Sequence, residues 1–433
     1  MEAILERAKK KSQHCEVFQV TSQRTPVKFE ANNLKQIQTK ESSTTALRLI
    51  KDGRVGFAQV TGEVDVDLLV SLALETSKFG AVAEFELPSL KTYPQVEVFD
   101  PEVEKVTTKE MIQVGEQLID AMRKHSPEIV CEASIAKGTA TISMLNSQGG
   151  HFSYKKSFFS AGIEGMIIDG NDMLFVGDGQ SSCRPNLDPD TLISEVIEQL
   201  NLSRMKVGLS TQTMPVIFKP NGVASALISP LVSAFNGKTV YMGASPLKDK
   251  LGAQVFDKKF SVTDDATLPL EVASTPSDDE GVPGQRTNLV ENGRVKQFIY
   301  DLQTAGLAKT RSTGNGCRGG GLPSPSVNSV VIASGETSFN DMVAHIKMGL
   351  VVEQLMGAGQ GNVLNGDFSG NVLLGYKIEN GAITGRVKDT MVSGNVYEAL
   401  KEIEAIGTDT RWVEGFLKTP SICCANLSVA AKG

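Results

Sequence analysis

Residues 345–359 read His-Ile-Lys-Met-Gly-Leu-Val-Val-Glu-Gln-Leu-Met-Gly-Ala-Gly, and Asn-Gly-Asp-Phe-Ser-Gly and Gly-Tyr-Lys-Ile-Glu-Asn-Gly follow at 365–370 and 375–381. Apolar side chains recur at helical spacing up to Met356, which predicts a helix over Phe339–Met356. The next glycines predict a turn. Asn380-Gly381 predicts a tight hairpin between strands at 373–379 and 382–387, because both central residues of such a turn need positive φ. A helix beside an antiparallel hairpin indicates an α+β chain.

The same kind of turn recurs outward from this stretch. Asp52-Gly53 and Asn292-Gly293 each separate two strand-like runs. A further antiparallel run from Ala133 to Phe175 is rich in Thr, Ile, Phe and Tyr, which suit strands, and is broken at Gly149-Gly150 and at Asp169-Gly170. Hairpins are therefore expected to make most of the strand connections.

Helices are expected between these hairpins. Asp188-Pro189-Asp190 combines a capping side chain with a proline in the first turn, which is typical of a helix start. The expected helices are Met1–Lys11, Val66–Phe79, Thr107–Lys124, Asp190–Met205, Gly222–Phe235, Phe339–Met356 and Asn395–Ala405. The fold class is thus α+β, with hairpin-rich, largely antiparallel sheets. The polar segments on either side of the fourth helix favour two domains, residues 1–208 and 209–433.

Composition narrows the class of protein. The 433 residues are 40% hydrophobic, so the chain can bury substantial cores. The net charge of -7 argues against a nucleic-acid partner, which would call for a basic face. The start of the chain alternates charged and apolar residues at helical spacing, unlike a signal peptide, and no apolar run is long enough to cross a bilayer. The expectation is a cytoplasmic protein with no membrane partner.

The cysteines and histidines bear on metal chemistry. The six cysteines show no Cys-x-x-Cys spacing, which disfavours a zinc ribbon or a disulfide scaffold. Cys423 and Cys424 lie in an expected final strand, with at least one of them an ordinary buried thiol. A helical zinc site would need two histidines about a turn apart with a glutamate between them. The four histidines are far apart in sequence, so no such motif can be written.

Several local patterns have a chemical and a structural interpretation. Gly314–Gly319 matches Gly-x-Gly-x-x-Gly, but Gly320-Gly321-Leu322-Pro323 follows and cannot start a regular helix, so a nucleotide site is disfavoured. Cys317 could serve as a nucleophile if His151 or His345 lay within hydrogen-bond reach. Two acidic clusters could bind a hard cation, although clustered acids in loops are usually solvated. They are the pair Asp264-Asp265 and the triplet Asp278-Asp279-Glu280.

The opening stretch resembles the TldD/PmbA family, also described as the modulator of gyrase or peptidase U62 family. The resemblance extends to Ala46–Phe57, to Asp279–Pro283 with Arg286-Thr287, and to Thr419-Pro420-Ser421. The matching residues of the opening stretch are Glu353, Leu355, Met356, Gly357, Gly366, Asp367, Phe368, Ser369, Glu379, Asn380 and Gly381. The family contains metallopeptidases, and it implies a TldD/PmbA-like fold.

The resemblance also implies where a zinc site would lie. In TldD-type members a His-Glu-x-x-x-His helix follows a strand such as 214–219, and here Ile228, Ser229 and Ser233 occupy the three positions. A third ligand, a cysteine, would fall within 409–415, where none occurs. Ile and Ser cannot replace imidazole ligands. The chain is therefore similar to the TldE/PmbA branch, with no catalytic residue, metal or cofactor of its own and zinc expected in the partner.

In family terms, such a chain is a non-catalytic subunit that assembles with a TldD-type zinc peptidase and acts on unfolded peptides, and it is a homodimer when alone. The loop Ser312, Thr313, Gly314, Asn315 and Gly316 resembles a family loop that lines the peptide-binding cleft. Two other functions stay open from the residues. One is a self-contained hydrolase with a different catalytic set, and the other is a homodimeric peptide-binding protein without chemistry.

Overall fold

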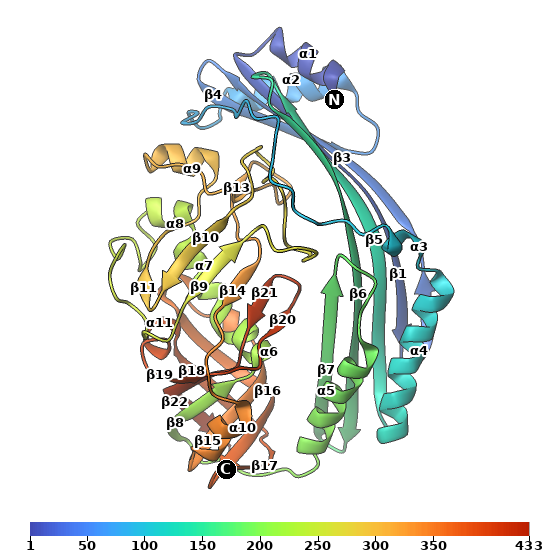
Figure 1. Cartoon of the computed structure of the whole chain (residues 1–433), viewed down its shortest axis with the longest axis vertical. Coiled ribbons are helices and arrows are strands. Elements are labelled where there is room, and N and C mark those ends of the chain that lie inside the picture. The colour runs from blue at the N-terminus through green and yellow to red at the C-terminus, as the bar shows by residue number, and fades with distance from the viewer. Residues whose placement is uncertain (433) are drawn as a thin grey trace.

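A computed structural model describes residues 1–432, and its largest element is a curved antiparallel sheet (Figure 1). Its strand order is β4-β3-β1-β5-β6-β7, and β2 also pairs with β1. The predicted turns between β3 and β4 and between β6 and β7 are tight, and the break predicted at Gly149-Gly150 is a longer turn between β5 and β6. The bounds are β1 His14–Glu30, β2 Asn33–Ile37, β3 Lys40–Lys51, β4 Arg54–Thr61, β5 Val130–Asn146, β6 His151–Asp169 and β7 Asp172–Ser182.

Helices pack on one face of this sheet, the face that carries Val17 and Phe29 of β1. α4 (Thr108–His125) starts with a reciprocal capping box between Thr107 and Glu110, and its Gly115 sits against the ring of Phe29 on β1. A side chain at Gly115 would overlap that ring, so glycine allows the close approach. The other helices of this half are α1 Glu2–Lys9, α2 Val66–Ser77, α3 Glu102–Lys105 and α5 Pro189–Leu202.

A second sheet closes on itself. Its order is β15-β8-β22-β18-β16-β17, and an additional pairing of β15 with β16 completes a ring of strands, while β19 pairs with β22. Such closure removes the free edges of the ring. The bounds are β8 Gln212–Phe218, β15 Met348–Met356, β16 Asp367–Glu379, β17 Ala382–Arg386, β18 Thr390–Asn395, β19 Ile403–Ile406 and β22 Ile422–Ala431.

A third sheet lies beside the ring, with order β11-β10-β9-β14-β21-β20. The separate hairpin of β12 and β13 carries the glycine-rich segment between them. The strands are β9 Val262–Asp265, β10 Arg286–Glu291, β11 Arg294–Val295, β12 Gly316–Cys317, β13 Ser324–Pro325, β14 Val330–Ile332, β20 Arg411–Val413 and β21 Leu417–Thr419. The helices are α6 Pro220–Val223, α7 Ser229–Phe235, α8 Gly237–Tyr241, α9 Leu302–Leu307, α10 Phe339–Ala344 and α11 Val396–Ala399.

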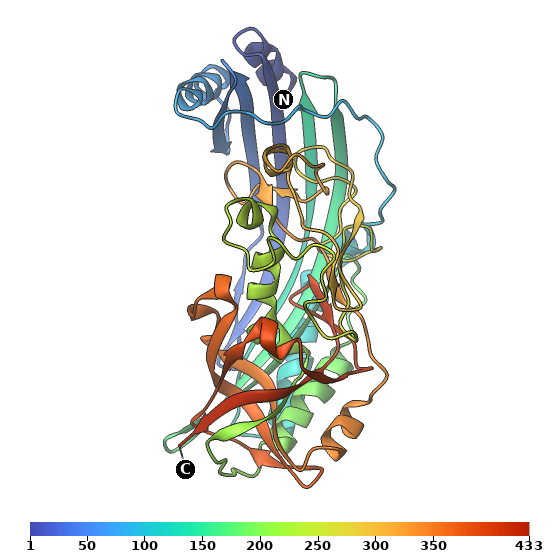
Figure 2. The same ribbon diagram turned by 90° about the vertical axis from the view of Figure 1, so that its left-hand side faces the viewer.

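The large sheet lies beside the rest of the chain in Figure 1 and behind it in Figure 2. One apolar core contains Val196 of α5 together with Val351 of β15 and Tyr376 of β16. Burial of such side chains removes apolar surface from water and stabilises the contact. Because this core spans residue 208, the division into domains 1–208 and 209–433 stays a prediction.

Two of the expected helices are wrong. The helix predicted over Phe339–Met356 ends at Ala344, and Met348–Met356 forms β15. Gly349–Glu353 is buried throughout, and periodicity cannot distinguish a strand buried on both faces from a buried helix. The helix predicted over Asn395–Ala405 is the four-residue α11 followed by β19.

The other expected helices are confirmed within a few residues at their ends, and residues 220–235 form α6, a π-helical turn and α7 in succession. The hairpins at Asn292-Gly293 and Asn380-Gly381 and the final strand with Cys423 and Cys424 are confirmed, and both thiols are buried. Among residues 1–432, no helix combines the length and the apolar character needed to cross a membrane.

Candidate functional site

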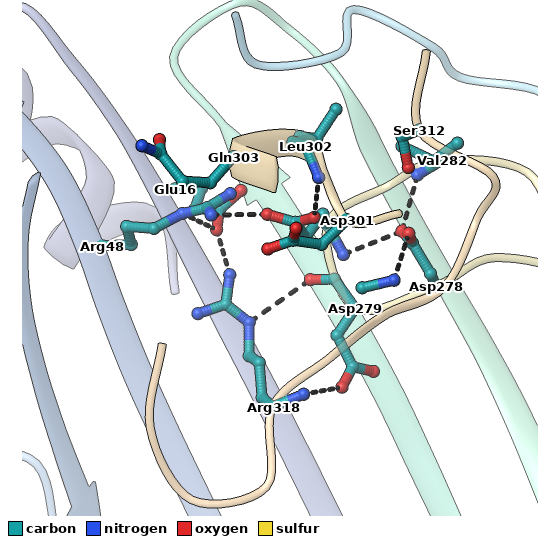
Figure 3. A network of polar contacts seen from close by, with 12 residues as sticks. Glu16, Arg48, Asp278, Asp279, Val282, Asp301, Leu302, Gln303, Ser312 and Arg318 are labelled. Carbon is teal, nitrogen blue, oxygen red and sulfur yellow. Dashed lines mark hydrogen bonds and ion pairs between the residues drawn. The ribbon is translucent and has the colours of Figure 1, made fainter. Parts of the chain in front are cut away.

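Three of the segments that carry the family resemblance meet on the inner face of the large sheet (Figure 3). Arg48 on β3 lies opposite Glu16 on β1 in the strand register, and its Nε lies 2.7 Å from Glu16 Oε1. The Arg48 Nη1 group donates to Glu280 Oε1 at 2.5 Å. None of these three side chains is more than 3% exposed. The geometry is therefore a buried ion-pair network, which we call the Arg48 network.

The hairpin of β12 and β13 adds a second arginine to this network. Arg318 donates through its guanidinium to Glu16 and through its Nε to the backbone oxygen of Asp279 at 3.3 Å. The backbone N–H of Arg318 donates to Asp279 Oδ2 at 2.7 Å. The guanidinium also lies over the ring of Phe18, 5.2 Å from its centroid. Segments far apart in the sequence are thus held to one strand of the sheet.

Asp278 organises the backbone around the network. Its Oδ1 accepts from the N–H groups of Glu280 at 3.0 Å and Val282 at 2.8 Å, and its Oδ2 accepts from the N–H of Gly316 at 2.9 Å. Glu280 Oε2 accepts from the N–H of Leu302 at 2.7 Å. These carboxylates are therefore used by the chain itself, which disfavours the hard-cation interpretation of Asp278-Asp279-Glu280.

The loop Ser312–Gly316 is mostly turned into the protein. Thr313 and Asn315 are each 2% exposed. The Thr313 hydroxyl oxygen accepts from Tyr300 N–H at 2.8 Å, and the Asn315 amide donates to Asp264 Oδ2 at 2.6 Å. A Cβ on Gly316 would lie 2.4 Å from Glu280 Oε2, so that glycine permits packing against the network. Whether the loop lines a peptide cleft stays a prediction, and its polar groups are used within the chain.

Burial shifts the titration of the acidic groups. It raises the pKa of Asp264 to about 6, against the hydrogen bonds from Asn315 and Asn328, and it raises the pKa of Asp278 well above its usual range. Burial also raises the pKa of Glu280, although Arg48 acts in the opposite direction. The Arg48 network contains more carboxyl groups than guanidinium groups. The positive charges of Arg48 and Arg318 therefore offset only part of the cost of burying the carboxylates, and the pKa values of the carboxyls rise.

Cys317 lies beside the Arg48 network, and the residue as a whole is exposed. Burial of the thiol and the nearby Asp279 and Asp278 raise its pKa to about 11, so the unreactive thiol form dominates at neutral pH. The candidate bases have other contacts. His151 Nδ1 lies 3.4 Å from Gly149 O, and His345 Nδ1 lies 2.6 Å from Asp341 O. Within residues 1–432 no hydrogen bond joins Cys317 to either histidine, so nothing in this geometry supports a Cys-His pair.

The three positions expected from the zinc motif lie in different environments. Ile228 is 4% exposed and belongs to the apolar core, Ser229 is exposed, and Ser233 is half-buried. In the segment 409–415, Asp409 accepts from the backbone N–H and the hydroxyl of Ser421 at 3.1 and 2.6 Å. Residues 1–432 contain no group of three His, Cys, Asp or Glu side chains placed to hold a metal ion.

The opening stretch contributes a second buried ion pair. Lys219 Nζ, at the end of β8, lies 2.6 Å from Glu353 Oε1 on β15. Burial raises the pKa of Glu353, and Lys219 acts against that rise. The Lys219 ammonium also lies over the ring of Phe339, 5.4 Å from its centroid. This pair fixes α6, which starts after Lys219, against β15.

The segments that form the Arg48 network lie in two regions that match known protein domains. The family model for the PmbA/TldA metallopeptidase C-terminal domain matches residues 211–431, and that for domain 1 matches residues 15–77. The chain belongs to the PmbA/TldD family. The Arg48 network therefore joins the two family domains, because Glu16 and Arg48 lie in the first and Glu280 and Arg318 in the second.

Individual proteins and solved structures are similar to this chain. A Methanocaldococcus jannaschii protein, MJ0231, is 26% identical over 98% of both chains. The metalloprotease PmbA of Escherichia coli O157:H7 is 33% identical over 46% of this chain and 42% of its own. The crystal structure of TldE from Thermococcus kodakarensis superimposes over 100% of both chains, with a TM-score of 0.91 and 25% identity. A Thermotoga maritima structure described as a modulator of DNA gyrase shares the fold, with 22% identity, 99% coverage of both chains and a TM-score of 0.89.

The Arg48 network was not predicted from the sequence. A signal was present, because Arg48 stands inside the apolar run Leu47-Arg48-Leu49-Ile50 and Glu16 stands between Cys15 and Val17. A charged residue inside an apolar strand points to a buried partner of opposite charge. The identity of that partner, Glu280, has no local signal.

Proposed function

We propose that this PmbA/TldD chain is a non-catalytic, TldE/PmbA-type subunit that assembles with a TldD-type zinc peptidase. The observation that carries the proposal is the environment of Ile228, which fills the apolar core where the zinc motif would place an imidazole. A peptidase zinc needs three protein ligands and an open position for water. The proposal places that chemistry in the partner subunit.

Two organisms among the relatives support a pairing of unlike members. Haemophilus influenzae has both a metalloprotease PmbA homolog and a metalloprotease TldD homolog. Methanocaldococcus jannaschii has both MJ0231, which aligns with this chain over its whole length, and metalloprotease MJ0996, which aligns over 46% of this chain. Two members in one organism are what a complex of a binding and a catalytic subunit requires.

The substrates under this proposal are unfolded peptides. Extended peptides bind through backbone hydrogen bonds with little sequence preference. Because Thr313, Gly314, Asn315 and Gly316 are buried, peptide contact falls on the more exposed residues farther along the same segment, Gly319–Leu322. A Cβ added at Gly319, Gly320 or Gly321 meets no atom within 4 Å, so a peptide backbone can approach there.

Reconstitution tests the proposal. The purified chain alone is expected to bind no stoichiometric zinc and to leave unfolded casein intact. Mixing it with the TldD-type subunit from the same source should give a stable complex with chelator-sensitive cleavage. The control is the same TldD-type subunit with both motif histidines replaced by alanine, which should form the complex without cleavage. Chelator-sensitive cleavage by this chain alone would contradict the proposal.

A further inference from the structure

A surface over α8 and α9 is rich in basic residues. The segments 236–256 and 302–315 contain a single acidic residue, Asp249. All of their basic residues are exposed. We call these residues the α8–α9 cations, and they are Lys238, Lys248, Lys250, Lys309 and Arg311. The chain as a whole has a net charge of -7, so the sign of this surface is opposite to that of the whole molecule.

The two segments are neighbours in the fold. Helices α8 and α9 are in contact, and they lie next to each other in Figure 1. Gly237 N–H donates to Ile299 O at 2.8 Å, and Thr313 N–H donates to Tyr300 O at 3.1 Å. The start of α8 and the chain that follows α9 therefore flank the same two residues, and the cations of both segments belong to one surface.

The charges of this surface are not used within the chain. Among residues 1–432, no salt bridge involves an α8–α9 cation, and the nearby bridges join Lys259 to Asp257 and Lys296 to Glu291. Glu84 packs against α9, but it forms no ion pair with a cation of this surface. Unpaired charges of one sign create a local potential that attracts a partner of the opposite sign.

Apolar side chains are exposed among the cations. Tyr241 and Met242, at the end of α8, are 50% and 69% exposed, and Leu251 is 62% exposed. The loop between them folds back on α8, since Lys248 Nζ lies 3.6 Å from the position of a Cβ on Gly243. A partner of this surface therefore meets apolar and positively charged groups together.

The surface adjoins the segment where the proposed function places peptide contact. Asn236, which caps α8, donates through its Nδ2 to Pro325 O on β13 at 2.8 Å. Strand β13 ends the hairpin that carries Gly319–Leu322. An extended peptide rises about 3.3 Å per residue, so a peptide bound at Gly319–Leu322 reaches the cations within several residues.

The composition of the surface favours a polypeptide as the partner. A nucleic acid would bind through its phosphate backbone, which the net charge of -7 repels and which has no contact to offer the exposed apolar side chains. A peptide with both acidic and apolar side chains is complementary to both kinds of group. Because exposed ion pairs are individually weak, such selection depends on several of them acting together.

We propose that the α8–α9 cations select acidic peptides. Carboxylate side chains of an extended peptide pair with these cations, while its apolar side chains pack on Tyr241, Met242 and Leu251. The substrate class is then unfolded peptides rich in Asp and Glu. This inference rests on the proposed function for the path of the peptide, and its test uses the purified chain alone.

Fluorescence anisotropy measures binding of a labelled, unstructured peptide in which glutamates alternate with small apolar residues. The comparison peptide has lysine in place of every glutamate. The purified chain should bind the glutamate peptide about tenfold more tightly than the lysine peptide at about 50 mM salt, and the ratio should approach one at about 0.5 M salt, where charges are screened.

Charge reversal tests the surface itself. Lys238→Glu combined with Lys250→Glu should reduce the preference for the glutamate peptide to about twofold or less. The matched control is Lys109→Glu combined with Lys124→Glu. Both of these lysines are exposed on α4, on the other side of the large sheet in Figure 1, and the control makes the same change in net charge. It should keep the preference, and both double variants should keep the Tm of the wild type.

Four results would overturn the inference. They are absence of binding, equal affinity for the two peptides, a preference that survives Lys238→Glu with Lys250→Glu, and binding of duplex DNA or anionic vesicles, but not of the glutamate peptide, that depends on these lysines. Reconstitution with the TldD-type subunit decides the proposed function separately. Cleavage by that complex together with equal peptide affinities would show that only the acidic preference is wrong. A charge preference without any complex would contradict the subunit role alone.

Discussion

Arg48 Nη1 and Glu280 Oε1 lie 2.5 Å apart although 232 residues separate them in the sequence. Both side chains are almost completely buried, so their charges are removed from water. Two ions in such a site stabilise the fold only when each has its partner and further hydrogen bonds. Glu16 and Leu302 N–H supply those additional contacts here. The pair therefore holds the 278–282 loop against the large sheet.

Replacing Arg48 by methionine should destabilise the protein severely. The change leaves Glu16 and Glu280 buried without a cation, and breaking a buried pair in this way costs about 3–5 kcal/mol. Urea unfolding measures the loss of free energy of unfolding. Arg7→Met is the control, because Arg7 pairs with Asp67 at an exposed site, where an ion pair contributes about 1 kcal/mol or less. Equal effects of the two changes would contradict the role assigned to Arg48.

Asp264 should make stability depend on pH in an unusual direction. Burial raises its folded-state pKa to about 6 from the ordinary 3.8. Between about pH 4 and about pH 6 the native protein therefore holds more protons than the unfolded chain, and the contribution of Asp264 to stability falls as pH rises, by about 3 kcal/mol in total.

The measurement for Asp264 is the difference in free energy of unfolding between wild type and Asp264→Asn at several pH values. Other carboxyls contribute equally to both proteins, so the difference isolates Asp264. Relative to the variant, the wild type should lose stability as pH rises across this window and change little above it. A difference that is constant with pH, or that grows in favour of the wild type as pH rises, would show that folding does not raise the pKa of Asp264.

The fold was predictable where the signal is local. Asx-Gly turns identified the hairpins at Asp52-Gly53, Asn292-Gly293 and Asn380-Gly381, since their backbone conformation demands those residues. The strand over Met348–Met356 was not predictable in this way, because a strand buried on both faces shows no alternation. Its identity depends on neighbours such as β8 and β16, which are distant in the sequence.

In the candidate site, too, local signals were predictable and long-range contacts were not. The family resemblance placed Ile228, Ser229 and Ser233 where a zinc motif would need His and Glu. The same reasoning gave no information on their environments, which differ from buried core to exposed surface. Likewise, the Ser312–Gly316 loop was recognisable, but its inward orientation depends on Tyr300, Asp264 and Asp278, which fold back on it from elsewhere.

Gly316→Ala should destabilise the protein because the site has no room for a side chain. The added Cβ would lie 2.4 Å from Glu280 Oε2, and overpacking of this kind costs about 1–3 kcal/mol. Thermal and urea unfolding measure the change. Gly319→Ala, in the same glycine-rich segment, meets no atom within 4 Å and should shift stability by about 1 kcal/mol or less in either direction. If both alanine variants behave alike, Gly316 does not pack as described.

The triple variant Ile228→His, Ser229→Glu and Ser233→His should not become a zinc peptidase. A third ligand and the groups that orient the ligands are also needed, and the 409–415 segment contains no cysteine. Because Ile228 lies in the apolar core, its replacement by a polar ring should also lower stability by about 1–3 kcal/mol.

Zinc content, casein cleavage and urea unfolding measure zinc binding, activity and stability of the triple variant. Ser229→Glu alone is the control, since Ser229 is exposed, and it should unfold like the wild type. One tightly bound zinc per chain with chelator-sensitive cleavage by the triple variant would show that these three positions suffice, and the buried environment of Ile228 would then have to open in solution.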